Sequence, residues 1–176
     1  MPDDSHKHLR RLERVWLDSP VYFVTACTDQ RRRILADAAV ADILTGEWRT
    51  GGERHGWLVG RYVIMPDHVH FFCAARPDAK TLAEFVRLWK QWTTKRMKMA
   101  GLTALNKRGY NRETAVINRG YSAGPTRVWQ REFFDHVLRS EESYAEKWGY
   151  VLQNPVRAGL TARAEDWPFQ GEIYPL

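Results

Sequence analysis

The sequence predicts an α+β protein whose strands and helices alternate in the order β-α-β-β-α-β, followed by one added C-terminal helix. Runs rich in β-branched and aromatic residues alternate with stretches of helical period, which suits a ferredoxin-like antiparallel sheet with two helices on one face. A chain of 176 residues, 44% of them hydrophobic, is also long enough to bury a core of its own. We expect one domain over 1–176, with its core at about 20–168.

The first half of the chain carries the patterns of three strands and one helix. In order, these are a strand at 21–28, a helix at 36–48, and strands at 57–65 and 68–75 that meet at a tight turn, Pro66-Asp67. The strands are rich in aromatic and β-branched residues, whereas the helix is rich in alanine. We expect Gly51 and Gly52 to end this helix.

The second half adds a long helix, a basic loop, a strand and the added helix. Thr81 and Glu84 have the spacing of a capping box, which favours a helix start at that point. Ser140 is placed to cap the last helix, and Pro155 limits it because the residue before proline disfavours helical geometry. In order, the predicted segments are a helix at 81–99, a basic loop at about 101–127, a strand at 128–138 and a helix from Ser140.

The charge of the chain favours a polyanionic partner, with nucleic acid preferred over a membrane. There are 27 Lys and Arg against 21 Asp and Glu, a net charge of +6. No apolar run approaches the roughly 20 residues of a membrane span, and the first 14 residues lack a signal-peptide core. Cys27 and Cys73 lie in apolar runs and read as reduced thiols, so we expect a cytoplasmic protein.

Several basic side chains are candidates for contact with DNA phosphates. They lie in the loop after the first strand, on one side of the long helix, and in the basic loop. The alternative is that they form an ordinary solvated surface. The candidates are Arg31, Arg32, Arg87, Lys90, Lys95, Lys98, Lys107 and Arg108.

Two histidines in the third strand predict a metal site. His68 and His70 flank Val69, and because strand side chains alternate between faces, both imidazoles point the same way. Two imidazoles on one face suit a divalent metal ion, although an isolated pair of this kind can also be an ordinary set of hydrogen-bonded side chains.

A tyrosine on the last helix is the candidate nucleophile. Tyr144, Trp148 and Val151 have core spacing, whereas Tyr150 lies well off that stripe and Asn154 follows one turn later on its side. An amide oxygen on Asn154 would complete a mixed nitrogen and oxygen ligand set that suits Mg²⁺ or Mn²⁺. The metal would polarise a phosphate while the tyrosine attacks phosphorus. An exposed tyrosine without function is the alternative.

Three segments resemble the signatures of the REP-associated tyrosine transposases, which are relatives of the single-tyrosine HUH transposases. These segments are MPDHVH at 65–70, VWQREFFDHVLR at 128–139 and YVLQNPVRAGL at 150–160. The similarity extends over about 22–168, but the basic loop matches no pattern of the family.

The resemblance implies a role for each matching residue. His68 and His70 match the metal pair and Tyr150 matches the catalytic tyrosine, while Asn154 is similar to the asparagine of the REP-associated group. The implied activity is metal-dependent cleavage and joining of single-stranded DNA at short palindromic hairpins through a 5′-phosphotyrosine. The resemblance is compatible with either a monomer or a homodimer.

Several alternatives remain open from the sequence. Tyr110 and Tyr121 could be nucleophiles instead, although base stacking suits them better. His136 could join the metal or act as a base, but we favour a role in orienting the site or in structure. Trp129 and Phe134 are expected in the core. The whole chain could also be an inactive DNA-hairpin-binding module, or a metal phosphoesterase that uses water.

Overall fold

The computed structural model describes residues 20–102, 127–138 and 140–176, and its centre is a five-stranded antiparallel sheet. The strand order is β4-β1-β3-β2-β5. The strands are β1 Val21–Cys27, β2 Trp57–Ile64, β3 His68–Ala75, β4 Phe134–Leu138 and β5 Gln170–Glu172. The first four strands, with the helices between them, have the ferredoxin-like order, so the predicted fold class is confirmed.

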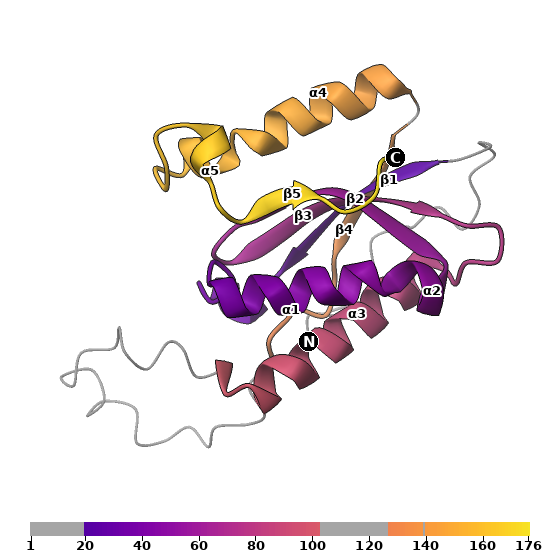
Figure 1. The fold of residues 1–176 in the computed structure, drawn as a ribbon, viewed down its shortest axis with the longest axis horizontal. Coiled ribbons are helices and arrows are strands. Elements are labelled where there is room, and N and C mark those ends of the chain that lie inside the picture. Colours follow the sequence, from indigo (N-terminus) through magenta and orange to yellow (C-terminus); the bar gives the residue numbers. More distant parts are fainter. Residues whose placement is uncertain (1–19, 103–126, 139) are drawn as a thin grey trace, which may run out of the picture.

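The helices lie on both faces of the sheet (Figure 1). One face is covered by α1 and α3, with the short α2 at the end of α1, and the opposite face is crossed by α4 and α5. Their bounds are α1 Ala38–Arg49, α2 Gly51–His55, α3 Leu82–Met99, α4 Glu141–Leu152 and α5 Asn154–Arg157, with 3-10 turns at Asp29–Arg31 and Ala164–Asp166.

Local capping sets where three of the helices begin. The Asp37 carboxylate accepts hydrogen bonds from the backbone of Ala39 and Val40 at the start of α1. The Thr81 and Ser140 hydroxyls accept from the third residue beyond them at the starts of α3 and α4. Each cap pairs backbone N–H groups that have no partner within the helix, which confirms the predicted helix starts at Thr81 and Ser140.

The helix α1 ends at Arg49, just before the two glycines, as we expected, but Gly51 and Gly52 then begin the short helix α2. A Cβ at Gly51 would lie 3.2 Å from the Phe85 ring, and one at Gly52 would lie 3.0 Å from the Leu58 side chain. The backbone of α2 therefore packs closely against neighbouring elements. Close approach to these neighbours therefore favours glycine at both positions.

The predicted strand at 128–138 is shorter than expected, because its first half leaves the sheet. Trp129 forms an isolated bridge with Thr28, just beyond the end of β1. The Lys90 ammonium, 8% exposed, donates hydrogen bonds to the carbonyls of Gln130, Arg131 and Glu132. In a β-sheet such carbonyls accept hydrogen bonds from a neighbouring strand, whereas here they accept hydrogen bonds from a buried lysine of α3.

The C-terminal segment adds an edge strand that the sequence did not predict. Trp167 is buried and donates its indole N–H to the Ile64 carbonyl at 3.0 Å, which fixes this segment beside the end of β2. The strand β5 then pairs with β2.

None of the helices within 20–102, 127–138 and 140–176 combines the length and apolar character that crossing a membrane would take.

Candidate active site

The two histidines of β3 point to the face of the sheet that α4 crosses. His68, His70 and Phe72 share this face, and Phe72 packs in the same hydrophobic cluster as Val151 of α4. The two imidazole rings lie 4.7 Å apart between centroids, with their planes at 82°. The predicted pairing of the imidazoles on one face is present.

Hydrogen bonds hold each imidazole through its Nδ1 atom. His68 donates to the Asp67 carboxylate at 2.7 Å, and Arg31 in turn binds that carboxylate at 2.9 Å. His70 Nδ1 is joined to the Thr25 hydroxyl at 2.8 Å, and its ring stacks on Phe23 at 5.3 Å. Because Nδ1 is engaged in both rings, Nε2 is the nitrogen available for a metal ion.

Burial keeps both imidazoles neutral at physiological pH. It lowers the pKa of His70 to about 3, and the neighbouring His68 ring and the positive charges of Arg31 and Lys147 lower it further. Burial also lowers the pKa of His68, against the opposing effect of Asp67. Since only a neutral imidazole offers a lone pair, both rings are in the form that binds metal.

Tyr150 lies on α4 with its side chain 63% exposed. The next residue, Val151, is buried in the cluster that contains Phe23 and Phe72, so this turn of the helix is fixed against the imidazole-bearing face. Figure 1 shows the C-terminal end of α4, and α5 after it, at the end of the sheet where β3 begins. The prediction that Tyr150 lies off the core stripe is confirmed.

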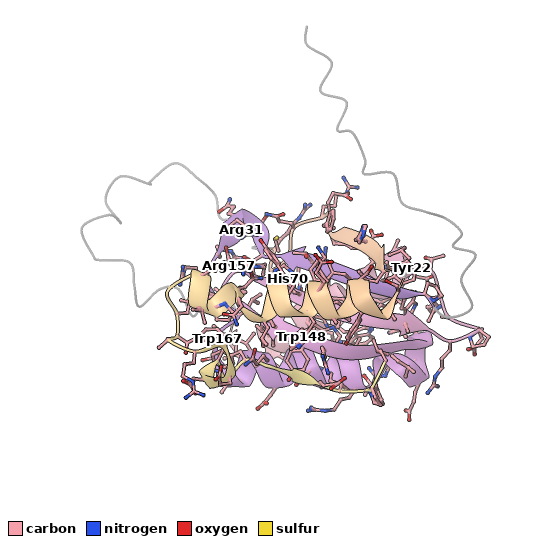
Figure 2. All side chains as sticks on the ribbon, turned by 90° about the horizontal axis from the view of Figure 1, so that it is seen from above. Tyr22, Arg31, His70, Trp148, Arg157 and Trp167 are labelled. Carbon is pink, nitrogen blue, oxygen red and sulfur yellow. The ribbon has the colours of Figure 1, made fainter. Side chains whose placement is uncertain are left out.

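Arg157 of α5 contacts both Tyr150 and Asn154. Its guanidinium lies 4.1 Å from the centroid of the Tyr150 ring and donates to the Tyr150 carbonyl at 2.6 Å. It also donates a hydrogen bond to the Asn154 amide oxygen. Figure 2 shows Arg157 projecting at the same end of the molecule as His70 and Arg31.

The position of Asn154 differs from the expected continuation of the nucleophile helix. The helix α4 ends at Leu152, and Asn154 begins α5, where Arg157 binds the oxygen that we expected to face a metal. In the described residues no three His, Cys, Asp or Glu side chains gather into a metal-binding group. The imidazole pair offers two nitrogen donors with open coordination positions, and this arrangement fits a catalytic divalent ion.

The predicted DNA-binding residues separate into different environments. Arg31 lies beside the imidazole pair, and Arg32 donates to the carbonyl of Arg127. Arg87 and Lys98 line a groove of about 600 Å³ with Arg127 and Arg131.

The remaining candidates have other surroundings. Lys95 lines a separate cavity of about 970 Å³, where its ammonium lies 4.9 Å from the Trp92 ring. Lys90 lines the same groove as Arg87 and Lys98, but the prediction that it contacts DNA is corrected, because its buried ammonium binds backbone carbonyls. Lys107 and Arg108, like Tyr110 and Tyr121, lie outside the described residues.

Two expectations about neighbouring residues are revised. Phe134 is 50% exposed, although we expected it in the core, whereas Trp129 is buried as expected. Phe134 pairs in register with Thr25 and so lies on the face of the imidazoles. His136 is exposed on the edge strand β4, and the observed hydrogen bonds that orient the imidazoles come from Asp67 and Thr25.

Four residues near the site were missed from the sequence. Asp67 is adjacent to His68, and a carboxylate beside a candidate ligand is a signal that was available. Arg157 lies within the third signature segment. No local pattern predicts the approach of Thr25 and Lys147 to His70, because strand register and helix packing bring them there.

An imidazole pair on a central strand of a ferredoxin-like sheet, with an exposed tyrosine on the helix across that face, defines a protein of the HUH class. A family model described as Transposase IS200 like matches residues 18–130, a range that includes both histidines. The chain belongs to this family of transposases.

Comparisons with individual proteins agree with the family. The chain is 33% identical over 112 residues to the REP-associated tyrosine transposase of Escherichia coli K12, covering 63% of this chain and 52% of that protein. It is 28% identical over 120 residues to a Haemophilus influenzae protein provisionally assigned to the same group, covering 64% and 61%. The chain thus spans little more than half the length of these relatives.

A solved structure has the same fold. It is a REP-associated tyrosine transposase bound to a REP hairpin, with a TM-score of 0.63 at 17% identity, covering 92% of this chain and 82% of that one. The resemblance expected from the three sequence motifs is confirmed.

Proposed function

We propose that this protein cuts and joins single-stranded DNA at short palindromic hairpins, with Tyr150 as the nucleophile and a divalent metal ion as cofactor. The observation that carries the proposal is the pair of neutral, oriented imidazoles on the face crossed by the helix of an exposed tyrosine. His68 and His70 would hold Mg²⁺ or Mn²⁺, with Asn154 as a third ligand only if its amide oxygen is shared with Arg157. The ion supplies a Lewis acid that polarises the scissile phosphate.

The chemistry assigned to Tyr150 is a transesterification. Its phenol oxygen forms a bond to phosphorus while the bond from phosphorus to the 3′ oxygen breaks. The phenol proton passes to solvent, and the departing 3′ oxygen takes up a proton from solvent. The products are a 5′-phosphotyrosine and a free 3′-hydroxyl. The reverse reaction with another 3′-hydroxyl joins strands. The Arg157 guanidinium, stacked beside the ring, stabilises negative charge that develops on the phenol.

Basic side chains offer a path for the DNA strand away from the site. Arg31 lies at the imidazole pair and Arg32 contacts the segment that begins at Arg127. That segment borders the groove lined by Arg87 and Lys98 of α3. A chain of cations suits a phosphate backbone. The hairpin as partner is supported by the solved relative, which is bound to a REP hairpin.

A hairpin oligonucleotide labelled on the 3′ side of the cleavage site tests the proposal. With Mg²⁺ or Mn²⁺ the wild-type protein should acquire label that survives denaturation, and Tyr150→Phe should lose this adduct while still binding the hairpin. His68→Ala should lose cleavage. Cleavage without an adduct would favour a water-using phosphoesterase instead, and binding without cleavage would indicate an inactive hairpin-binding module.

Mixing two inactive variants tests whether one chain or two chains form the active site. In a monomer one chain would carry both the imidazole pair and Tyr150, whereas in a homodimer a second copy could supply the tyrosine. Mixing Tyr150→Phe protein with His68→Ala protein should restore no adduct if one chain carries the whole site. Restored adduct would assign the tyrosine to a partner copy.

A further inference from the structure

A lysine on the nucleophile helix approaches the imidazole pair, and nothing in the proposed reaction has used it so far. Lys147 is half-buried, and its ammonium lies 5.1 Å from the centroid of the Phe23 ring. That same ring stacks on His70 at 5.3 Å. The Lys147 ammonium thus lies toward the imidazole pair rather than on the outer surface of α4.

The lysine charge has no anionic partner in the part of the chain that the structure describes. No ion pair there involves Lys147, and its contact is with an aromatic face. Arg31 and Arg157 bring further positive charge to this end, and the Asp67 carboxylate is already bound by Arg31 and His68. A half-buried cation in such surroundings is stabilised by an anion that arrives from outside.

The position of Lys147 on α4 relates it to the nucleophile. It precedes Tyr150 by three residues, so the two side chains lie on adjacent parts of one helical surface. A phosphate that meets both the Tyr150 oxygen and the imidazole pair must lie between the helix and the sheet. Lys147 lies on that same side of the helix, toward Phe23 and His70.

We propose that the Lys147 ammonium binds a non-bridging oxygen of the scissile phosphate and stabilises the negative charge that builds up there as Tyr150 attacks. The proposal rests on the function proposed above. No bond to lysine is made or broken, because the contribution is electrostatic. Such a fixed charge is most effective in a site shielded from water.

The test compares Lys147→Met and Lys147→Arg with Lys80→Met, a matched loss of an exposed lysine whose partner is Glu84. Adduct formation is measured in single turnover at saturating hairpin DNA. We expect Lys147→Met to slow the step about 100-fold, Lys147→Arg to recover part of the rate, and Lys80→Met to have no effect. Affinity for the DNA should change much less than the rate.

A modified substrate separates phosphate contact from a structural role. Replacing one non-bridging oxygen by methyl, as a methylphosphonate, removes the charge that Lys147 would bind. On one of the two methylphosphonate diastereomers, Lys147→Met should then lower the rate of adduct formation by less than about threefold. Only direct contact between the lysine and the phosphate predicts such a coupling between the two changes. With EDTA present to prevent cleavage, wild-type protein should bind the phosphate substrate more tightly than that methylphosphonate. Lys147→Met protein should bind the two with similar affinity.

Two results would overturn the proposal. Equal losses on phosphate and methylphosphonate substrates would mean that Lys147 acts through packing of α4, and an unaffected rate would mean no contact at all. A failure of the proposed function gives a different result. In that case Tyr150→Phe protein would still form the adduct, whatever residue occupies position 147.

Discussion

The two faces of the sheet differ in what fills them. The face under α1 and α3 is packed with large aromatic side chains, among which the Trp48 and Trp89 rings stack at 5.2 Å. The face under α4 has a smaller cluster, and beside it lie His68, His70 and the exposed Tyr150. One face therefore supplies most of the buried apolar surface, and the other carries the candidate site residues.

A single strand serves both faces. Val69, Phe71 and Cys73 of β3 are buried in the aromatic core, while His68 and His70 point to the other side. Alternation along the strand separates stabilising residues from reactive ones without a change of element. A substitution on one face should consequently affect stability, and a substitution on the other should affect chemistry.

The largest expected effect belongs to the aromatic core. Trp48→Ala should lower the free energy of unfolding by about 3–5 kcal/mol, because the side chain is fully buried and leaves a cavity. Tyr150→Ala, at a side chain that is largely exposed, should change it by less than about 0.5 kcal/mol. Urea denaturation measures both. Similar losses in the two variants would refute the division between the faces.

The next effect concerns metal binding on the α4 face. Asp67→Asn should weaken the affinity for Mn²⁺ by about 10- to 100-fold, because the charged partner that orients and polarises His68 is lost. Calorimetric titration gives the affinity. Asp78→Asn, at an exposed carboxylate, is the control and should bind as wild type does. Unchanged binding in Asp67→Asn would show that the imidazole pair needs no carboxylate partner.

A smaller effect is expected at the exposed ring beside the site. Phe134→Ala should weaken the affinity for single-stranded DNA about tenfold, if a base stacks on this ring as it does on aromatic platforms elsewhere. Its neighbour Phe133 is buried, so Phe133→Ala should reduce stability instead. Fluorescence anisotropy and thermal unfolding distinguish the two. Full affinity in Phe134→Ala would leave the exposed ring without a role in binding.

The smallest effect separates two cations of α3. Arg87→Ala should leave stability unchanged and reduce the salt dependence of DNA binding by about 0.7 in slope, the value of one phosphate contact on a single strand. Lys90→Met should do the reverse, since it leaves buried carbonyls without their donor. Binding titrations at several salt concentrations provide the slope. If Lys90→Met protein kept its full stability but showed a reduced salt dependence of DNA binding, Lys90 would be a DNA contact after all.

The local pattern of the chain predicted the four strands of the ferredoxin-like order and the three long helices, and it placed the candidate site residues on their faces. Period-two alternation placed His68 and His70 on one face, and helical spacing placed Tyr150 off the core stripe. These features depend on residues a few positions apart, so they can be read from the sequence. The three motif segments added the family, which the family model then confirmed.

Tertiary structure alone decided which partners the site residues have. Strand register brings Thr25 to His70, and helix packing brings Lys147 over Phe23. The buried Lys90 likewise binds the carbonyls of residues 130–132, about 40 positions away, which lie outside the observed strand β4. Contacts of this kind depend on the positions of whole elements in space, and no local pattern encodes those positions.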